Sequence, residues 1–171
     1  LGVAIPSQNY LQSVRKICND RDILLIMDEV QTGLGRTGKL WAFEHFDIVP
    51  DIVVLGKGLS GGIYPITATV MRKPLEVVFH DDPFIHISTF GGAEIGCPIA
   101  RRVLEISSAP EFLGHVNRLA SLFAEKIEGL RRKHPKFLVK LRQLGLMMGV
   151  ELKDEISGPL LTKTAYDQEL S

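Results

Sequence analysis

The chain has 171 residues, of which 45% are hydrophobic, and its 20 basic side chains balance its 20 acidic ones. This length and composition suit a globular protein with a buried core. The balanced charge gives no electrostatic signal for nucleic acid, and no apolar run reaches the roughly 18 residues of a membrane span. We therefore expect neither nucleic acid nor a membrane among its partners.

The two cysteines, Cys18 and Cys97, lie far apart and lack the spacing of metal ligands. That usage indicates a reducing compartment without a disulfide framework, so we expect a cytoplasmic protein and no metal site. The chain begins Leu1-Gly2-Val3, with neither an initiator Met nor the basic and apolar regions of a signal peptide. This start leads us to expect a fragment of a longer protein.

Apolar residues at helical spacing predict a first helix over residues 8–19. The next feature is an apolar run over residues 23–27, which ends in Asp28 and Glu29. A short continuous apolar run is typical of a strand that is buried on both faces of a parallel sheet. A second such run, over residues 52–55, predicts a second strand.

The remaining elements follow in chain order: a β-branched strand over residues 66–71, a loop rich in hydroxyls and glycine over 84–92, a helix over 95–107, a helical stripe over 113–130, and two strands over 138–142 and 146–152. The sequence Ser-Ser-Ala-Pro at 107–110 is the best candidate boundary. We therefore expect two domains, over residues 1–108 and 109–171. The polar tail from Lys153 predicts no element.

Two chemically distinctive residues follow the predicted strands. Asp28 ends the first strand, and Lys57 lies between two glycines after the second. Ligands in open α/β sheets bind at the carboxyl ends of the strands, so one crevice can hold both side chains. A lysine amine that is removed from water becomes a nucleophile that forms Schiff bases. Pyridoxal phosphate requires such a lysine, together with an acid for its pyridine nitrogen.

Two other interpretations remain open at this point. The acidic pair can simply close a strand at its solvated end. Alternatively, residues 33–39 resemble a phosphate-binding loop, because Gly33 and Gly38-Lys39 have nearly the required spacing. That alternative predicts a nucleotide-binding module, but Leu40 stands where a Ser or Thr should bind magnesium.

Several motifs resemble those of the class III (ω-amino acid) aminotransferases, especially the acetylornithine, ornithine, putrescine and 4-aminobutyrate group. In order, they are Asp28-Glu29-Val30-Gln31-Thr32-Gly33, Gly35-Arg36-Thr37-Gly38, Pro50-Asp51-Ile52, Gly56-Lys57-Gly58 and His86-x-Ser88-Thr89-Phe90-Gly91-Gly92. The resemblance implies an α/β, fold-type I pyridoxal-phosphate enzyme. The chain would then hold part of the mostly parallel sheet of the large domain and the start of an α+β small domain.

The resemblance also implies roles for individual residues. Lys57 resembles the Schiff-base lysine, and Asp28 the partner of the pyridine nitrogen. Val30 would pack on one face of the ring, and Gln31 would lie near the phenolic oxygen. Thr89 resembles the residue that binds the phosphate in the neighbouring subunit of a homodimer.

The implied activity is transfer of an amino group from an amine or (ω-)amino acid to a 2-oxo acid. Arg36 would help to shape the entrance of the site, and Glu29 receives no role. The family's chains are more than twice as long as this one. A third hypothesis is therefore that this chain alone is a catalytically inactive part of the enzyme.

Overall fold

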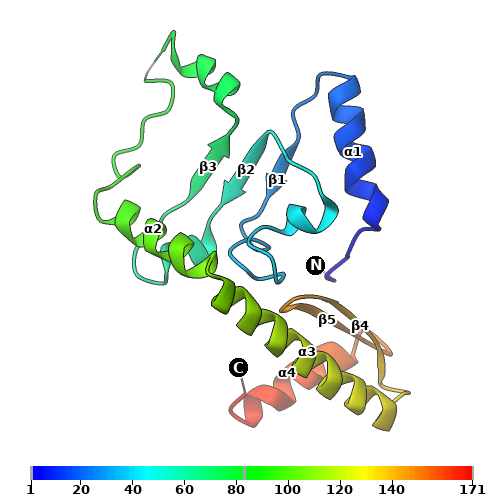
Figure 1. Cartoon of the computed structure of the whole chain (residues 1–171). Helices are drawn as coiled ribbons and strands as arrows, with labels where there is room; N and C mark the ends of the chain where they lie inside the picture. Colours follow the sequence, from blue (N-terminus) through cyan, green and yellow to red (C-terminus); the bar gives the residue numbers. More distant parts are fainter. Residues whose placement is uncertain (1, 83, 171) are drawn as a thin grey trace.

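The computed structural model describes residues 2–82 and 84–170 (Figure 1). Its larger sheet contains β1 (Ile26–Asp28), β2 (Ile52–Leu55) and β3 (Ala68–Met71), in that order. β1 and β2 are parallel, whereas β3 is antiparallel to β2. The carboxyl ends of β1 and β2 therefore meet at one edge of the sheet, as the sequence predicted.

Helix α1 (Gln8–Asp20) covers only one face of β1. Cys18 of the helix and Leu25, just before the strand, are buried in a core cluster with Phe46 and Ile48. Successive side chains of a strand point to opposite faces, and Ile26 is 56% exposed. The prediction that this strand is buried on both faces is therefore wrong within the described residues.

Short 3-10 helices follow each strand of this sheet, and an α-helix comes after the last of them. They are η1 (Ala42–Phe46), η2 (Lys57–Ser60), η3 (Lys73–Phe79) and α2 (Gly96–Ser107). The long helix α3 (Pro110–Lys133) begins three residues after α2 ends, so the predicted break at 107–110 coincides with the start of a new helix. Figure 1 shows the two helices following each other below the sheet.

The second sheet is a hairpin of β4 (Leu138–Leu144) and β5 (Met147–Leu152), which confirms the two strands predicted around Gly145. It packs on α3, where the side-chain amide of Gln143 donates to the carbonyl of Ala120 at 2.7 Å. The tail adds a helix that the sequence did not predict, α4 (Ser157–Asp167). Asp154 accepts hydrogen bonds from the backbone N–H and the hydroxyl of Ser157 at the start of this helix.

Across residues 2–82 and 84–170, no helix is long and apolar enough to cross a membrane. The same residues contain no group of three or more His, Cys, Asp or Glu side chains that could hold a metal ion.

Asp51 joins three elements at the edge of the sheet away from the Lys57 end. This side chain is 4% exposed, and it accepts hydrogen bonds from the backbone N–H of Leu25 at 2.8 Å and from Arg15 at 2.6 Å. It also pairs with Arg72. These donors, led by the Leu25 N–H, lower the pKa of Asp51 from 3.8 to about 2. The ionised carboxylate therefore stabilises the fold.

The hairpin holds the loop of residues 33–39 by direct backbone contact. The N–H of Leu146 donates to the carbonyl of Arg36 at 2.9 Å. Gly145 has φ +58°, and a Cβ at this position would lie 2.2 Å from the carbonyl carbon of Thr37. On the other side of the loop, His45 Nε2 lies 3.0 Å from the carbonyl oxygen of Thr37, and burial lowers the pKa of this histidine. The loop is therefore fixed from both sides.

We expect Asp51→Asn to lower the free energy of unfolding by about 2 kcal/mol at neutral pH, because the shifted pKa measures the stabilisation of the carboxylate. A pKa that is lower in the folded state stabilises the fold above pH 3.8 and loses that effect as the pH falls toward 2. Urea unfolding between pH 7 and pH 2 should therefore show a shallower pH dependence in the variant. Asp20→Asn removes an exposed ion pair with Lys16 and should change stability little.

We expect Gly145→Ala to destabilise the protein by about 2–4 kcal/mol, because the new methyl group meets a backbone and the residue must keep a positive φ. Gly129→Ala is the matched control. Gly129 lies inside α3, and a methyl group added there would meet no atom within 4 Å, so alanine should stabilise by about 0.5–1 kcal/mol. Equal melting temperatures for the two variants would contradict the proposed contact.

Candidate active site

The site is built where β1 and β2 end side by side. The N–H of Glu29, just after β1, donates to the carbonyl of Val54 in β2 at 2.9 Å. Just beyond the two strands, Val30 packs against Gly56, where a Cβ would lie 3.4 Å from Val30 Cγ1. Lys57 follows directly, so the parallel pairing places it beside the chain that leaves β1.

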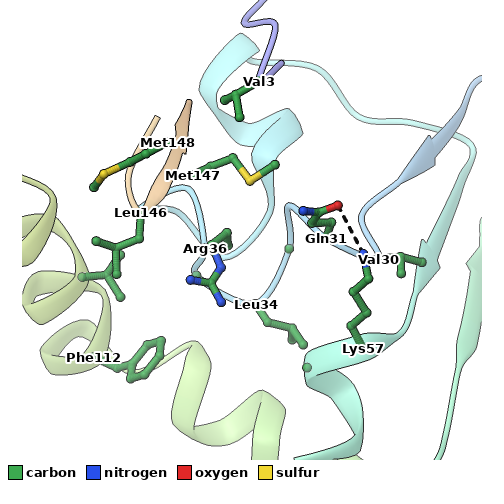
Figure 2. Close-up of a pocket in the computed structure, with 14 residues that line it drawn as sticks. Val3, Val30, Gln31, Leu34, Arg36, Lys57, Phe112, Leu146, Met147 and Met148 are labelled. Atoms are coloured by element: carbon green, nitrogen blue, oxygen red, sulfur yellow. Dashed lines mark hydrogen bonds between the residues drawn. The ribbon is translucent and has the colours of Figure 1, made fainter. Parts of the chain in front are cut away.

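Lys57 has an unusual backbone conformation. Its backbone φ is +44°, a value that residues other than glycine rarely adopt. Gly56 and Gly58 flank it. Such a conformation costs on the order of 1 kcal/mol and is often found at functional sites. Leu59, which is 2% exposed, anchors the turn in the core. The ammonium group of Lys57 donates to Gln31 Oε1 at 3.2 Å (Figure 2).

A cavity of about 550 Å³ opens beside Lys57. Its volume is typical of sites for small molecules. The lining combines residues from the two strand ends, from the loop of residues 33–39, from α3 and from the β4–β5 hairpin (Figure 2). They are Val3, Val30, Gln31, Gly33, Leu34, Gly35, Arg36, Lys57, Gly58, Phe112, Val116, Leu146, Met147 and Met148.

Three of the predicted site residues, Val30, Gln31 and Lys57, line this cavity together. Thr89 does not: it is exposed in the loop between η3 and α2. In that loop the N–H of Gly91 donates to the carbonyl of Ser88 at 3.1 Å, which forms the turn around Thr89. Its role toward the neighbouring subunit stays a prediction.

Asp28 lies next to the cavity. It lines an adjoining space of about 260 Å³, which shares Val3 and Met147 with the Lys57 cavity. Its Oδ1 accepts a hydrogen bond from the N–H of Val30 at 3.0 Å, and the side chain is exposed. A carboxylate at this strand end is available to a ligand, and its role also stays a prediction.

Glu29, which received no role from its sequence, supports the structure of the site. Its side chain is 2% exposed and accepts hydrogen bonds from the Thr32 hydroxyl and from the N–H of Phe43, the latter at 3.0 Å. These bonds fix the turn that carries Gln31. The available signal was the alternation of a strand, which places Glu29 on the face opposite Asp28.

The glycines of the loop serve packing between protein segments. A Cβ on Gly33 would lie 2.9 Å from the Trp41 ring, so glycine lets the indole cover the loop. Gly38 lies against α3, where Asn117 Nδ2 donates to its carbonyl at 3.1 Å. These contacts explain the glycine spacing without a phosphate ligand.

The nucleotide-binding alternative gains no support. Lys39 Nζ donates to the carbonyl of Glu44 at 2.7 Å, and Lys39 does not line the Lys57 cavity. The loop also leads into a 3-10 helix of five residues rather than into a long helix, whose N-terminus would bind phosphate.

Comparisons with known proteins identify the family. The aminotransferase class-III family matches residues 1–168. An uncharacterized aminotransferase of Archaeoglobus fulgidus is 46% identical over 166 residues, which make up 97% of this chain and 39% of that protein.

Two solved structures share the fold. N-acetylornithine aminotransferase from Stenotrophomonas maltophilia is 30% identical, with a TM-score of 0.85 over 99% of this chain and 43% of that one. Taurine:2-oxoglutarate aminotransferase from Bifidobacterium kashiwanohense, solved in complex with pyridoxal phosphate and glutamate, is 26% identical, with a TM-score of 0.89 over 99% of this chain and 41% of that one.

The chain thus spans about two fifths of the length of these relatives. The structural matches confirm the α/β, fold-type I architecture that the motifs implied. By its motifs, its fold and its match over residues 1–168, the chain belongs to the class III aminotransferase family.

Proposed function

We propose that the protein containing this chain is a pyridoxal-phosphate-dependent transaminase. It would move an amino group from an amine or (ω-)amino acid to a 2-oxo acid. The observation that carries this proposal is the Lys57 amine, held by a strained backbone in the wall of a cavity of about 550 Å³. The family match and the relative that binds pyridoxal phosphate and glutamate support it.

The residues around Lys57 fit this cofactor by their chemistry. The Lys57 amine would hold its aldehyde carbon, Val30 would pack on a ring face, and Gln31 would face the phenolic oxygen. Asp28 is the proposed partner of the pyridine nitrogen, and Thr89 the proposed phosphate ligand. When bound, pyridoxal phosphate supplies an electron-withdrawing ring that stabilises negative charge on the substrate carbon.

The protein's own groups would perform the remaining tasks. Lys57 Nζ is the proposed group that removes and returns the proton at the substrate carbon bearing the amine. Gln31 orients this nitrogen through the 3.2 Å hydrogen bond. The apolar side chains of Leu34, Phe112 and Val116 on the cavity wall would exclude water from the reacting groups.

We further propose a homodimer with shared active sites. The loop that carries Thr89 exposes several large apolar side chains, which suit an interface: Phe84, Ile85, Ile87 and Phe90. The position of this loop outside the Lys57 cavity supports a role toward a second subunit.

We also propose that residues 1–108 belong to the large domain and 109–171 to the small one. We further propose that the protein works in the cytoplasm, which its two free cysteines support.

We expect Lys57→Ala to lower the amino-transfer rate of the full-length enzyme by about a hundredfold or more, because it removes both the cofactor's attachment and the proton carrier. Borohydride reduction with pyridoxal phosphate, followed by peptide mapping, should label Lys57 in the wild type. Lys39→Ala, which removes a lysine outside the cavity, should retain both the rate and the label. A Lys57→Ala enzyme with the wild-type rate would refute the proposed function.

Mixed dimers test the role of Thr89. We expect Thr89→Ala to weaken cofactor binding by about tenfold, the effect of one hydrogen bond to a charged group. Co-folding Thr89→Ala with Lys57→Ala subunits should restore one site per heterodimer, because that site combines an intact Lys57 with the partner's intact threonine. Cofactor titration of the mixture measures this recovery. If Thr89 served its own subunit, every site in the mixture would remain defective.

A further inference from the structure

The cavity beside Lys57 has one sign of charge. Among its lining residues, Arg36 and Lys57 are cationic, and none carries a carboxylate. A cleft with charges of one sign concentrates ions of the opposite sign. The remaining wall is largely apolar and includes Leu34, Phe112, Val116, Leu146, Met147 and Met148.

Arg36 has a fixed backbone and an available side chain. Its N–H donates to the carbonyl of Gly33 at 3.3 Å, and its own carbonyl accepts from Leu146 at 2.9 Å. The guanidinium extends into the cavity (Figure 2). Within residues 2–82 and 84–170 it makes neither a hydrogen bond nor an ion pair, whereas Arg15 and Arg72 are both paired with Asp51.

A guanidinium fork matches the two oxygens of a carboxylate, and a rigid backbone reduces the entropy lost on binding. Arg36 and Lys57 enter the cavity from different elements, the loop after β1 and the start of η2. The apolar wall suits a methylene chain. A substrate with an amine at one end and a carboxylate at the other would use all three features.

We propose that Arg36 is a specificity-determining residue that binds the carboxylate of the amino donor, an inference that rests on the proposed transaminase function. The donor would then be an ω-amino acid or a dicarboxylic amino acid. A plain alkylamine would leave Arg36 without a partner and would be a poorer substrate.

The test compares two donors in the full-length holoenzyme: δ-aminovalerate and pentylamine, which differ only by a carboxylate in place of a methyl group. Single-turnover reactions without a 2-oxo acid, followed by cofactor absorbance, keep the acceptor's carboxylate out of the measurement. We expect Arg36→Gln to lower kcat/KM for δ-aminovalerate by about tenfold or more and to change that for pentylamine by less than about twofold. Arg36→Lys keeps the charge but loses the fork, so its kcat/KM for δ-aminovalerate should lie between the values of the wild type and of Arg36→Gln.

Arg118→Gln is the matched control, because Arg118 is an exposed arginine of α3 outside the cavity. This variant should leave kcat/KM unchanged for both donors. A second readout that needs no turnover is calorimetric binding of glutarate to the holoenzyme. Arg36→Gln should weaken this binding by about tenfold or more, and Arg118→Gln should leave it unchanged.

Different outcomes test the role of Arg36 and the transaminase function. Equal losses for both donors in Arg36→Gln would indicate a structural role and overturn the inference, as would unchanged glutarate binding. A wild-type enzyme that transfers amino groups without preferring the carboxylated donor, or that does not bind glutarate, would also overturn it. A wild-type enzyme that accepts an amino group from no amine would overturn the transaminase function, while glutarate binding would still report on Arg36.

Discussion

The parallel pairing of β1 with β2 is the constraint on which the rest of the site depends. Its last hydrogen bond, from Glu29 to Val54, sets the register in which the two strands end together. A shift of one residue would turn every side chain of β1 to the opposite face and remove Asp28 from the edge of the sheet. Lys57 meets Gln31 only because the intervening chain, over a separation of 26 positions, returns to that edge.

The buried side chain of Glu29 links the end of β1 to the loop that follows this strand. A buried carboxylate is costly without partners, and Glu29 obtains them from Thr32 and Phe43 on either side of residues 33–41. The turn after β1 and the start of η1 are therefore tied to the same group. The hairpin then closes against Arg36 and Thr37 through close backbone approaches. One buried acid and one glycine, Gly145, thus set the shape of the entrance to the cavity.

Sequence reasoning succeeded where a local pattern carries the information. Apolar periodicity predicted α1, α3 and the hairpin, and the positions of Asp28 and Lys57 after apolar runs predicted a shared edge. It could not predict that Met147 would reach the Lys57 cavity, because this contact joins segments that lie far apart in the sequence. It missed α4, whose segment begins with Ser-Gly-Pro and lacks a continuous apolar stripe. It also left Glu29 without a role, since the partners of a buried acid become visible only after folding.

The site combines local strain with an uneven distribution of charge, and both oppose stability when no ligand is present. Lys57 keeps a positive φ that glycine would adopt at less cost, yet glycine would remove the amine. Arg36 adds a second cation to the same cavity, where like charges repel. The Asp28 carboxylate lies in the adjoining space, so the wall of this cavity itself holds no partner for the two cations, whereas Asp51 pairs with Arg15 and Arg72 at the other edge of the sheet. An anionic ligand in the cavity would supply a counter-charge to Arg36 and Lys57, so these two unfavourable features favour binding over stability.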